Sequence, residues 1–118
     1  MQLFFSPYLD FIRKTAENLP EVTEKLCYDT PAFYVAGKLF ARLKEDGETL
    51  AIHIGDRDKW MQEDSETFFI TDHYLKSKYM LVALGSVKPK VLENLLKEAW
   101  KSRASKKILK QFEQPEKS

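Results

Sequence analysis

The sequence predicts an α+β fold, a two-layer sandwich in which an antiparallel sheet carries its helices on one face. Apolar residues recur at helical spacing towards both ends of the chain. Between these ends the apolar period falls to two, which is typical of strands with one buried face. An Asp46-Gly47 pair separates two alternating segments and indicates a hairpin between them.

The first element is predicted to be a helix that ends at Pro20. Ser6 suits its N-cap, and Pro7 suits the first helical position. The apolar residues that recur at helical spacing in this segment are Tyr8, Phe11, Ile12, Ala16 and Leu19.

Four antiparallel segments are predicted to follow the first helix. The first covers residues 26–28, and the second covers 32–35 and turns at Ala36-Gly37. The third and fourth flank the Asp-Gly turn and show the clearest alternation. Their apolar positions are Leu39, Ala41 and Leu43, then Leu50, Ile52 and Ile54.

The second half of the chain is predicted to hold a short helix, two strands and two further helices. Acidic residues at the start of 56–61 suit the positive end of a helix. Strands are predicted at 68–70 and 79–84, with a polar loop at 71–78 between them. An amphipathic helix follows from about Pro89, and a last one covers 105–112.

The composition is that of one ordinary globular domain, expected over residues 1–112, with a polar tail at 113–118. The chain has 118 residues, of which 43% are hydrophobic and 31% are charged. The single cysteine excludes an internal disulfide and a cysteine-rich zinc site. We expect a cytoplasmic protein without membrane attachment, because no apolar run and no signal peptide is evident.

The most distinctive segment runs from Tyr28 to Leu43 and reads YDTPAFYVAGKLFARL. With this segment, with Phe68–Tyr74 and with the helix that ends at Ala99-Trp100, the chain resembles the MmcQ/YjbR-like family of small bacterial proteins. The resemblance covers roughly residues 7–112. It implies an α-β3-α-β2-α layout related to that of type III secretion chaperones. It also implies a DNA-binding role, since paired hairpins look like a double wing, and it implies no enzymatic activity.

Charge is distributed unevenly along the chain and bears on DNA binding, because lysine and arginine neutralise phosphates. Residues 1–87 hold ten basic and fourteen acidic side chains, whereas residues 88–118 hold nine basic and four acidic ones. If double-stranded DNA is the partner, the candidate contacts are Lys38, Arg42, Lys76, Lys78, Lys101, Arg103, Lys106, Lys107 and Lys110. The alternative is that the basic residues of the last helices simply form a solvated helix face, and that Lys38 and Arg42 only cover an open sheet face.

The clearest hairpin tip, Glu45-Asp46-Gly47-Glu48, does not suit a wing, because its three carboxylates repel phosphates. The loop at 73–78 is the better candidate, since it combines two lysines, a histidine and an aromatic ring.

Two other functions stay open beside DNA binding. One is a protein-interaction or chaperone-like module, either monomeric or homodimeric. The other is a small-molecule-binding domain whose pocket lies around the proline-led segment. The candidate pocket residues are Tyr28, Phe33, Tyr34, His73 and Tyr74.

Catalytic and metal-binding patterns are sparse, so we expect a protein that is not an enzyme and has no cofactor or metal. Cys27 with a histidine is a candidate thiol–imidazole pair, but a free cysteine beside Leu26 is more typical of a buried hydrophobe. His53 is interpreted as a hydrogen-bonded structural residue. The acidic residues at 56–64 lack the spacing and the glycine of a calcium loop.

Overall fold

The computed structural model describes residues 6–113, and for Glu113 it describes the backbone alone. An antiparallel sheet of six strands forms one layer, in the order β1-β2-β3-β4-β6-β5. The chain runs through α1 (Leu9–Glu17), β1 (Val22–Cys27), β2 (Thr30–Val35), β3 (Lys38–Leu43), β4 (Thr49–His53), α2 (Arg57–Glu63), β5 (Phe68–Phe69), one 3-10 turn η1 (Asp72–Tyr74), β6 (Tyr79–Ala83), α3 (Pro89–Arg103) and α4 (Lys106–Glu113).

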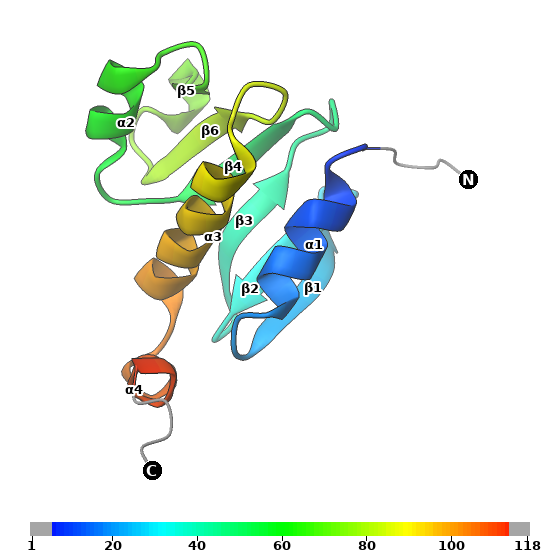
Figure 1. The fold of residues 1–118 in the computed structure, drawn as a ribbon, viewed down its shortest axis with the longest axis vertical. Helices are drawn as coiled ribbons and strands as arrows, with labels where there is room; N and C mark the ends of the chain where they lie inside the picture. Colours follow the sequence, from blue (N-terminus) through cyan, green and yellow to red (C-terminus); the bar gives the residue numbers. More distant parts are fainter. Residues whose placement is uncertain (1–5, 114–118) are drawn as a thin grey trace.

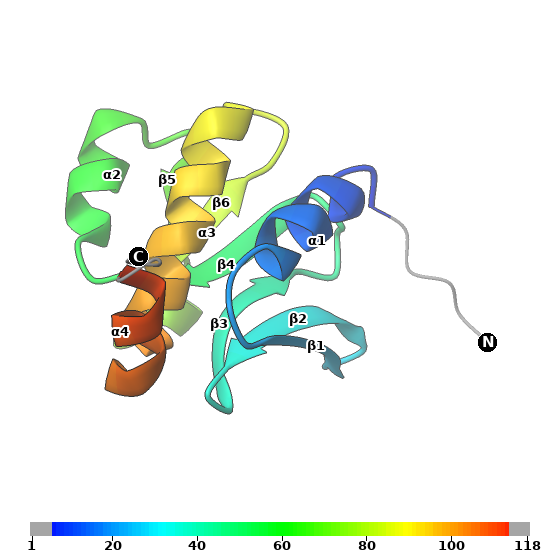
Figure 2. The ribbon, with the colours of Figure 1, turned by 60° about the horizontal axis from the view of Figure 1, so that its bottom comes forward.

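The helices α1 and α3 form the second layer and lie over the same face of the sheet (Figures 1 and 2). The helix α2 packs at the β5 end, and α4 follows the C-terminal end of α3. This arrangement confirms the predicted α+β fold. Four strands precede α2, one more than the family layout implies, because β1 adds an edge strand to the sheet.

The core lies between this sheet face and α3. Alternate residues of the strands point into it, and the apolar stripe of α3 covers them. Trp100 of α3 is fully buried, and its Nε1 donates a hydrogen bond to the Pro20 carbonyl oxygen at 2.9 Å. The α3 helix is thereby tied to the loop that joins α1 to β1.

The structure corrects the predicted bounds of the first strand and the predicted start of the first helix. The first strand is Val22–Cys27 rather than 26–28, and Tyr28 lies in a turn at φ 53°. The first helix begins at Leu9, because Ser6 forms a turn before it: its Oγ accepts a hydrogen bond from the Tyr8 backbone N–H and donates one to the Gly47 carbonyl.

The remaining elements lie within two residues of their predicted ends, except that 71–78 contains the turn η1. The α4 helix ends at Glu113, one residue beyond the predicted helix end at 112. Residues 114–118 of the predicted polar tail lie outside the described residues. Within residues 6–113, no helix is both long enough and apolar enough to cross a bilayer.

Candidate functional site

A pocket of about 440 Å³ lies on the face of the sheet that α1 and α3 leave uncovered. Its floor includes Arg42 of β3 and Ala51 of β4, which are direct neighbours across the strands. Both alternate with core residues, so they point to the open face. They are nevertheless buried, because the β1–β2 turn and the loop at 71–78 rise on either side.

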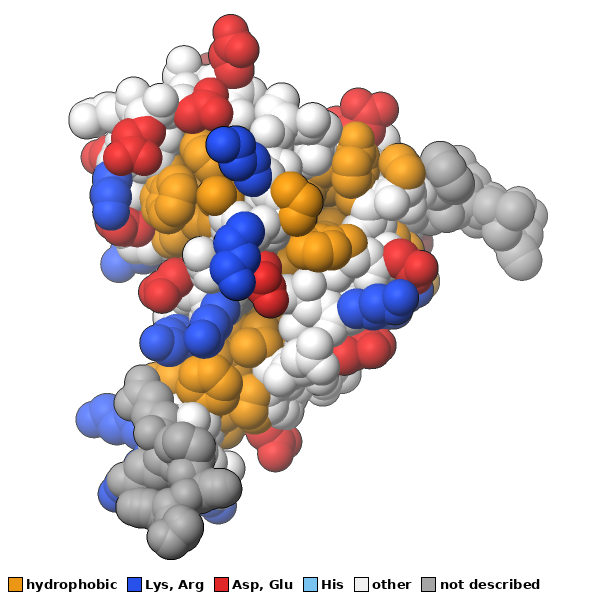
Figure 3. Space-filling view, in the orientation of Figure 1, with side chains coloured by type: hydrophobic (Ala, Val, Ile, Leu, Met, Phe, Trp, Pro, Cys, Tyr) orange, Lys and Arg blue, Asp and Glu red, His pale blue; other side chains and the backbone are white. Residues whose placement is uncertain are grey.

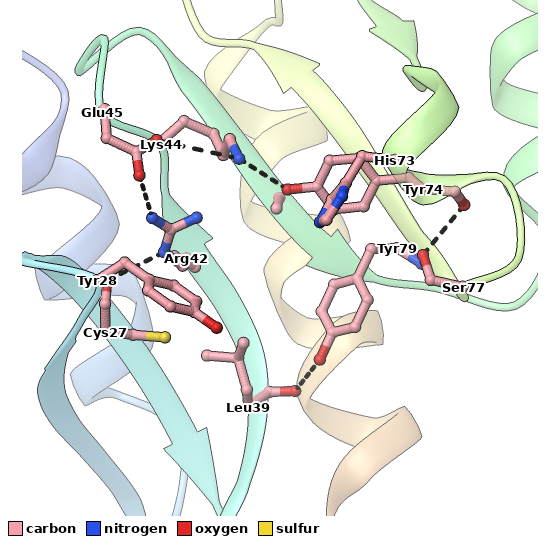
Figure 4. Close-up of a pocket in the computed structure, with 11 residues that line it drawn as sticks. Cys27, Tyr28, Leu39, Arg42, Lys44, Glu45, His73, Tyr74, Ser77 and Tyr79 are labelled. Atoms are coloured by element: carbon pink, nitrogen blue, oxygen red, sulfur yellow. Dashed lines mark hydrogen bonds and ion pairs between the residues drawn. The ribbon is translucent and has the colours of Figure 1, made fainter.

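Figure 4 shows Arg42 and Tyr28 on one side of the pocket and His73, Tyr74 and Ser77 on the other. The Tyr28 side chain is 81% exposed and lies at the tip of the β1–β2 hairpin. Its ring centroid is 5.1 Å from the Arg42 guanidinium carbon, which is a cation–π distance.

Arg42 is the buried charge of the site, with only 7% of the residue exposed. Its Nε donates to the Cys27 carbonyl oxygen at 3.1 Å, and its Nη2 donates to Glu45 Oε2 at 2.6 Å. Glu45 is held ionised: its own backbone N–H and the Arg42 guanidinium lower the pKa of its carboxyl group. The guanidinium is therefore fixed in position by two partners.

Lys44 places a second cation at the rim of the pocket. Its Nζ donates a hydrogen bond to the Tyr74 hydroxyl at 2.8 Å and lies 4.0 Å from Glu45 Oε1. Figure 4 shows that this side chain reaches from β3 towards the loop at 71–78. Two cations therefore face one carboxylate, and the pocket has an excess of positive charge.

The loop at 71–78 is fixed by Arg57 at the start of α2. Its guanidinium donates three hydrogen bonds to backbone carbonyl oxygens: to Tyr74 at 3.0 Å, to Leu75 at 2.9 Å and to Tyr79 at 2.7 Å. On the floor, the Tyr79 hydroxyl donates to the Leu39 carbonyl oxygen at 2.9 Å, and burial raises the pKa of this phenol. The walls of the pocket are thus held by hydrogen bonds from several elements.

The structure brings three of the five predicted pocket residues together: Tyr28, His73 and Tyr74 all line the pocket. Phe33 does not line it, because strand alternation turns its side chain into the core, where it is 0% exposed. Tyr34 also lies outside the lining residues, and Lys25 Nζ sits 4.5 Å from the centroid of its ring.

Sequence reasoning missed several pocket residues, among them Lys44, Glu45 and Tyr79. Lys44 follows an alternating strand, and Tyr79 begins another one, so each has the pattern of an ordinary strand residue. Only the pairing of β4 with both β3 and β6 brings them to one face, and no local signal reveals that pairing.

A group of basic residues meets at the end of the sheet where β4 ends. Arg103 Nη1 lies 3.1 Å from His53 Nε2, and His53 Nδ1 lies 2.7 Å from Ser102 Oγ. Burial lowers the pKa of His53, and the positive charges of Arg103 and Lys78 lower it further. The Ile54 N–H donates a hydrogen bond to the Lys78 carbonyl oxygen at 2.8 Å, so the loop at 71–78 and the end of α3 both bring a cationic residue to the end of β4.

The helix α4 extends this positive region. Its apolar residues pack against the core, and its lysines at 106, 107 and 110 are exposed. In Figure 3, Lys and Arg side chains surround the end of the molecule where α4 lies, and Asp and Glu are frequent at the opposite end. We name this region the basic edge; it comprises Lys78, Arg103, Lys106, Lys107 and Lys110.

The other candidate DNA contacts lie in different places. Lys38 is exposed and begins β3 at the same end of the sheet, and Lys101 is half-buried near the end of α3. Lys76 is exposed in the loop before β6. Arg42 belongs to the pocket and is paired with Glu45, so it does not add to a surface patch.

The acidic turn at 45–48 lies at the end of the sheet opposite the basic edge, because β3 runs away from Lys38 and β4 runs back to His53. Asp46 is engaged within this turn: its carboxylate accepts hydrogen bonds from the Glu48 and Thr49 backbone N–H groups and from the Thr49 hydroxyl. Negative charge thus lies at one end of the β3 and β4 strands, and the basic edge lies at the other end.

A second pocket, of about 410 Å³, lies between α1, α3 and α4. Its polar lining side chains are exposed or half-buried, and no buried charge faces it.

Within the described part of the chain, no three His, Cys, Asp or Glu side chains come together as a metal site would need. Cys27 is half-buried and lines the first pocket.

Comparison with known proteins matches this architecture to one family. The YjbR family model matches residues 17–102. The crystal structure of Deinococcus radiodurans protein DR2400, which has the family-model domain DUF419, has a TM-score of 0.67 at 21% sequence identity; the match covers 78% of this chain and 75% of that one. At this identity the likeness shows the fold alone. None of the curated proteins matches the sequence. Because the family match spans most of the chain and includes every strand, the chain belongs to the YjbR family.

Proposed function

We propose that this chain is a non-enzymatic, cytoplasmic protein that binds the phosphate backbone of double-stranded DNA through the basic edge. The observation that carries the proposal is that Lys78 and Arg103 meet at the end of β4: the Lys78 carbonyl oxygen accepts a hydrogen bond from the Ile54 N–H at 2.8 Å, and Arg103, three residues before α4 begins, contacts His53. Cations from two distant segments of the chain then form one surface with the α4 lysines. Such a surface is what phosphate binding needs.

The basic edge holds its charge without internal neutralisation. Among the side chains of residues 6–112, the ion pairs within 4.0 Å involve Arg13, Arg42, Lys44 and Lys90, and no member of the basic edge. The α4 lysines at 106, 107 and 110 share the solvent face of the helix, because 106 and 110 are four residues apart and 107 and 110 are three apart. Exposed cations on one face are suited to bind phosphate oxygens.

The acidic turn at 45–48 favours a particular orientation on DNA. It lies at the opposite end of the sheet, so the basic edge contacts the duplex while the carboxylates point away. The β3–β4 hairpin is therefore not a DNA-contacting wing in this proposal. Binding through backbone phosphates carries little sequence information, so we expect weak sequence preference.

The test is fluorescence anisotropy with a labelled duplex and the double variant Lys106→Glu, Lys107→Glu. Both positions lie in the first turn of α4, where negative charge suits the helix dipole, so the fold is expected to persist. Loss of two phosphate contacts is expected to weaken binding at least about tenfold in about 50 mM salt.

The matched control is Lys88→Glu, Lys90→Glu, which makes the same charge change at the start of α3. These lysines lie at the other end of a 15-residue helix, about 22 Å away along its axis. We expect the control to bind within about threefold of the unmodified chain. Equal weakening by both variants would mean that net charge alone governs binding, and the basic edge would then have no special role.

A further inference from the structure

We propose that the pocket on the open sheet face binds a small organic anion with a flat apolar body, an aromatic carboxylate being the class that fits best. None of the basic-edge residues lines this pocket, and the proposal does not depend on DNA binding. Its volume of about 440 Å³ is within the usual range of small-ligand sites. The proposal rests on three features: a buried cation with a free donor, aromatic walls, and a rigid frame.

The cation with a free donor is Arg42. Two of its nitrogens are occupied, Nε by the Cys27 carbonyl and Nη2 by Glu45. The remaining terminal nitrogen, Nη1, has no hydrogen-bond partner among the described residues and points into the pocket (Figure 4). A buried guanidinium held in one orientation is suited to a carboxylate, because its N–H groups are directed before the ligand arrives.

The electrostatic balance of the pocket favours an anion over a cation or a neutral molecule. Arg42 and Lys44 face a single carboxylate, Glu45, whose side chain is largely exposed to solvent. The Lys44 ammonium already reaches over the pocket to the Tyr74 hydroxyl. A ligand carboxylate therefore finds one cation in the wall and a second at the rim.

The apolar body of the ligand is indicated by the walls. Tyr28 and Tyr74 stand on opposite sides of the pocket, and Leu39, Ala51 and Tyr79 contribute to its floor and lower wall. Aromatic walls of this kind stack on flat rings. Inorganic phosphate satisfies Arg42 but leaves these walls uncovered, which is why a ring-bearing anion fits better.

The frame of the pocket is rigid. Arg57 fixes the loop at 71–78 with three hydrogen bonds, and the β1–β2 hairpin turns through Tyr28 and Asp29 at φ 53° and 67°. Neither residue is glycine, although left-handed turn positions favour glycine or asparagine. Tyr28 thus adopts a positive φ, which is unfavourable for a large aromatic residue, and its ring packs against the Arg42 guanidinium.

The experiment is an NMR titration of the full chain, observed through its backbone amide signals. Sodium benzoate is the probe, acetate is the anion without a ring, and benzyl alcohol is the ring without a charge. We expect saturable shifts for benzoate at residues around Arg42, Ala51 and Tyr74, with a Kd of about 1 mM or tighter. Acetate and benzyl alcohol are expected to bind at least about tenfold more weakly.

Two variants test the residues named. Arg42→Lys keeps the charge but loses the guanidinium fork, and Tyr28→Ala removes an exposed ring that the fold does not need. Each is expected to weaken benzoate binding about tenfold or more. The matched control for Arg42→Lys is Arg13→Lys, a change at an arginine whose ion pair with Glu24 lies on the exposed surface.

The proposal is wrong if benzoate fails to saturate the pocket signals, if its shifts centre on α3 or α4, or if Tyr28→Ala binds as the unmodified chain does. DNA binding at the basic edge and anion binding in the pocket are separable by the same variants. Lys106→Glu, Lys107→Glu is expected to bind benzoate normally, and Tyr28→Ala is expected to bind duplex DNA normally. Failure at one site leaves the other untouched.

Discussion

At the scale of single residues, the contacts of His53 determine which of its ring nitrogens carries the proton. An arginine is always a donor, so the contact from Arg103 Nη1 requires His53 Nε2 to be an acceptor. The proton of the neutral ring then lies on Nδ1 and is donated to Ser102 Oγ. Protonation of Nε2 would set two donors against each other beside two positive charges. The ring is thus structural, as its sequence position suggested.

The lowered pKa of His53 predicts a pH-dependent stability. Its folded pKa lies below the ordinary value of 6.5, so the unfolded chain binds the proton more readily. This contribution is fully present above about pH 6.5 and is lost as the pH falls towards the folded pKa. Urea unfolding at about pH 7.5 and about pH 5.5 measures it.

The reference for this measurement is His53→Asn, which cannot titrate. We expect the unmodified chain to lose more of its free energy of unfolding between the two pH values than the variant loses. Parallel losses would show that other groups account for the pH dependence.

A second prediction at this scale concerns Ala36, which turns the β2–β3 hairpin at φ 54° together with Gly37 at φ 75°. Both angles suit a type I′ turn, for which Asn-Gly is the preferred pair. Ala36 is exposed, so Ala36→Asn is expected to stabilise the fold by about 0.5–1 kcal/mol. Thermal unfolding should show a rise of a few degrees in Tm. Ala36→Val is expected to lower the Tm instead, because a β-branched residue resists positive φ. A lower Tm for Ala36→Asn would contradict this account.

At the scale of elements, the helices and strands that the sequence predicts best are those that bury one face. The strands β3 and β4 and the helix α3 are of this kind, so their apolar residues recur at the spacing typical of a strand or a helix. The edge strand β1 has no such pattern, because four of its six residues are exposed. Backbone pairing with β2, and not side-chain burial, makes β1 a strand.

The packing of α3 against the α1–β1 loop gives a prediction at this scale. Trp100→Phe keeps an aromatic ring in the core but removes the hydrogen bond to the Pro20 carbonyl. We expect a loss of about 1–3 kcal/mol in the free energy of unfolding, measured by urea denaturation. Trp60→Phe in α2 is the control, because Trp60 is only half-buried and stacks edge-on against Phe68. If Trp60→Phe lowers the free energy of unfolding as much as Trp100→Phe does, the hydrogen bond to Pro20 does not explain the loss.

At the scale of the whole molecule, the sequence shows that charge is uneven but does not show where it lies. The excess of lysine and arginine over residues 88–118 predicts a basic C-terminal region. The positions of Lys78 at the end of β4 and of the acidic turn at the far end of the sheet depend on strand order. The pocket is similar: Tyr28, His73 and Tyr74 were predictable candidates, whereas the inward turn of Phe33 follows from the strand register.

The separation of charge along the sheet is the feature on which the proposed function depends, and salt dependence tests it most directly. The measurement is the affinity of the unmodified chain for a labelled duplex at about 50 mM and about 200 mM salt. If four residues of the basic edge contact phosphates, affinity should fall by about 100-fold between these concentrations. An affinity that changes by less than about threefold, or no binding at the lower salt concentration, would contradict the account.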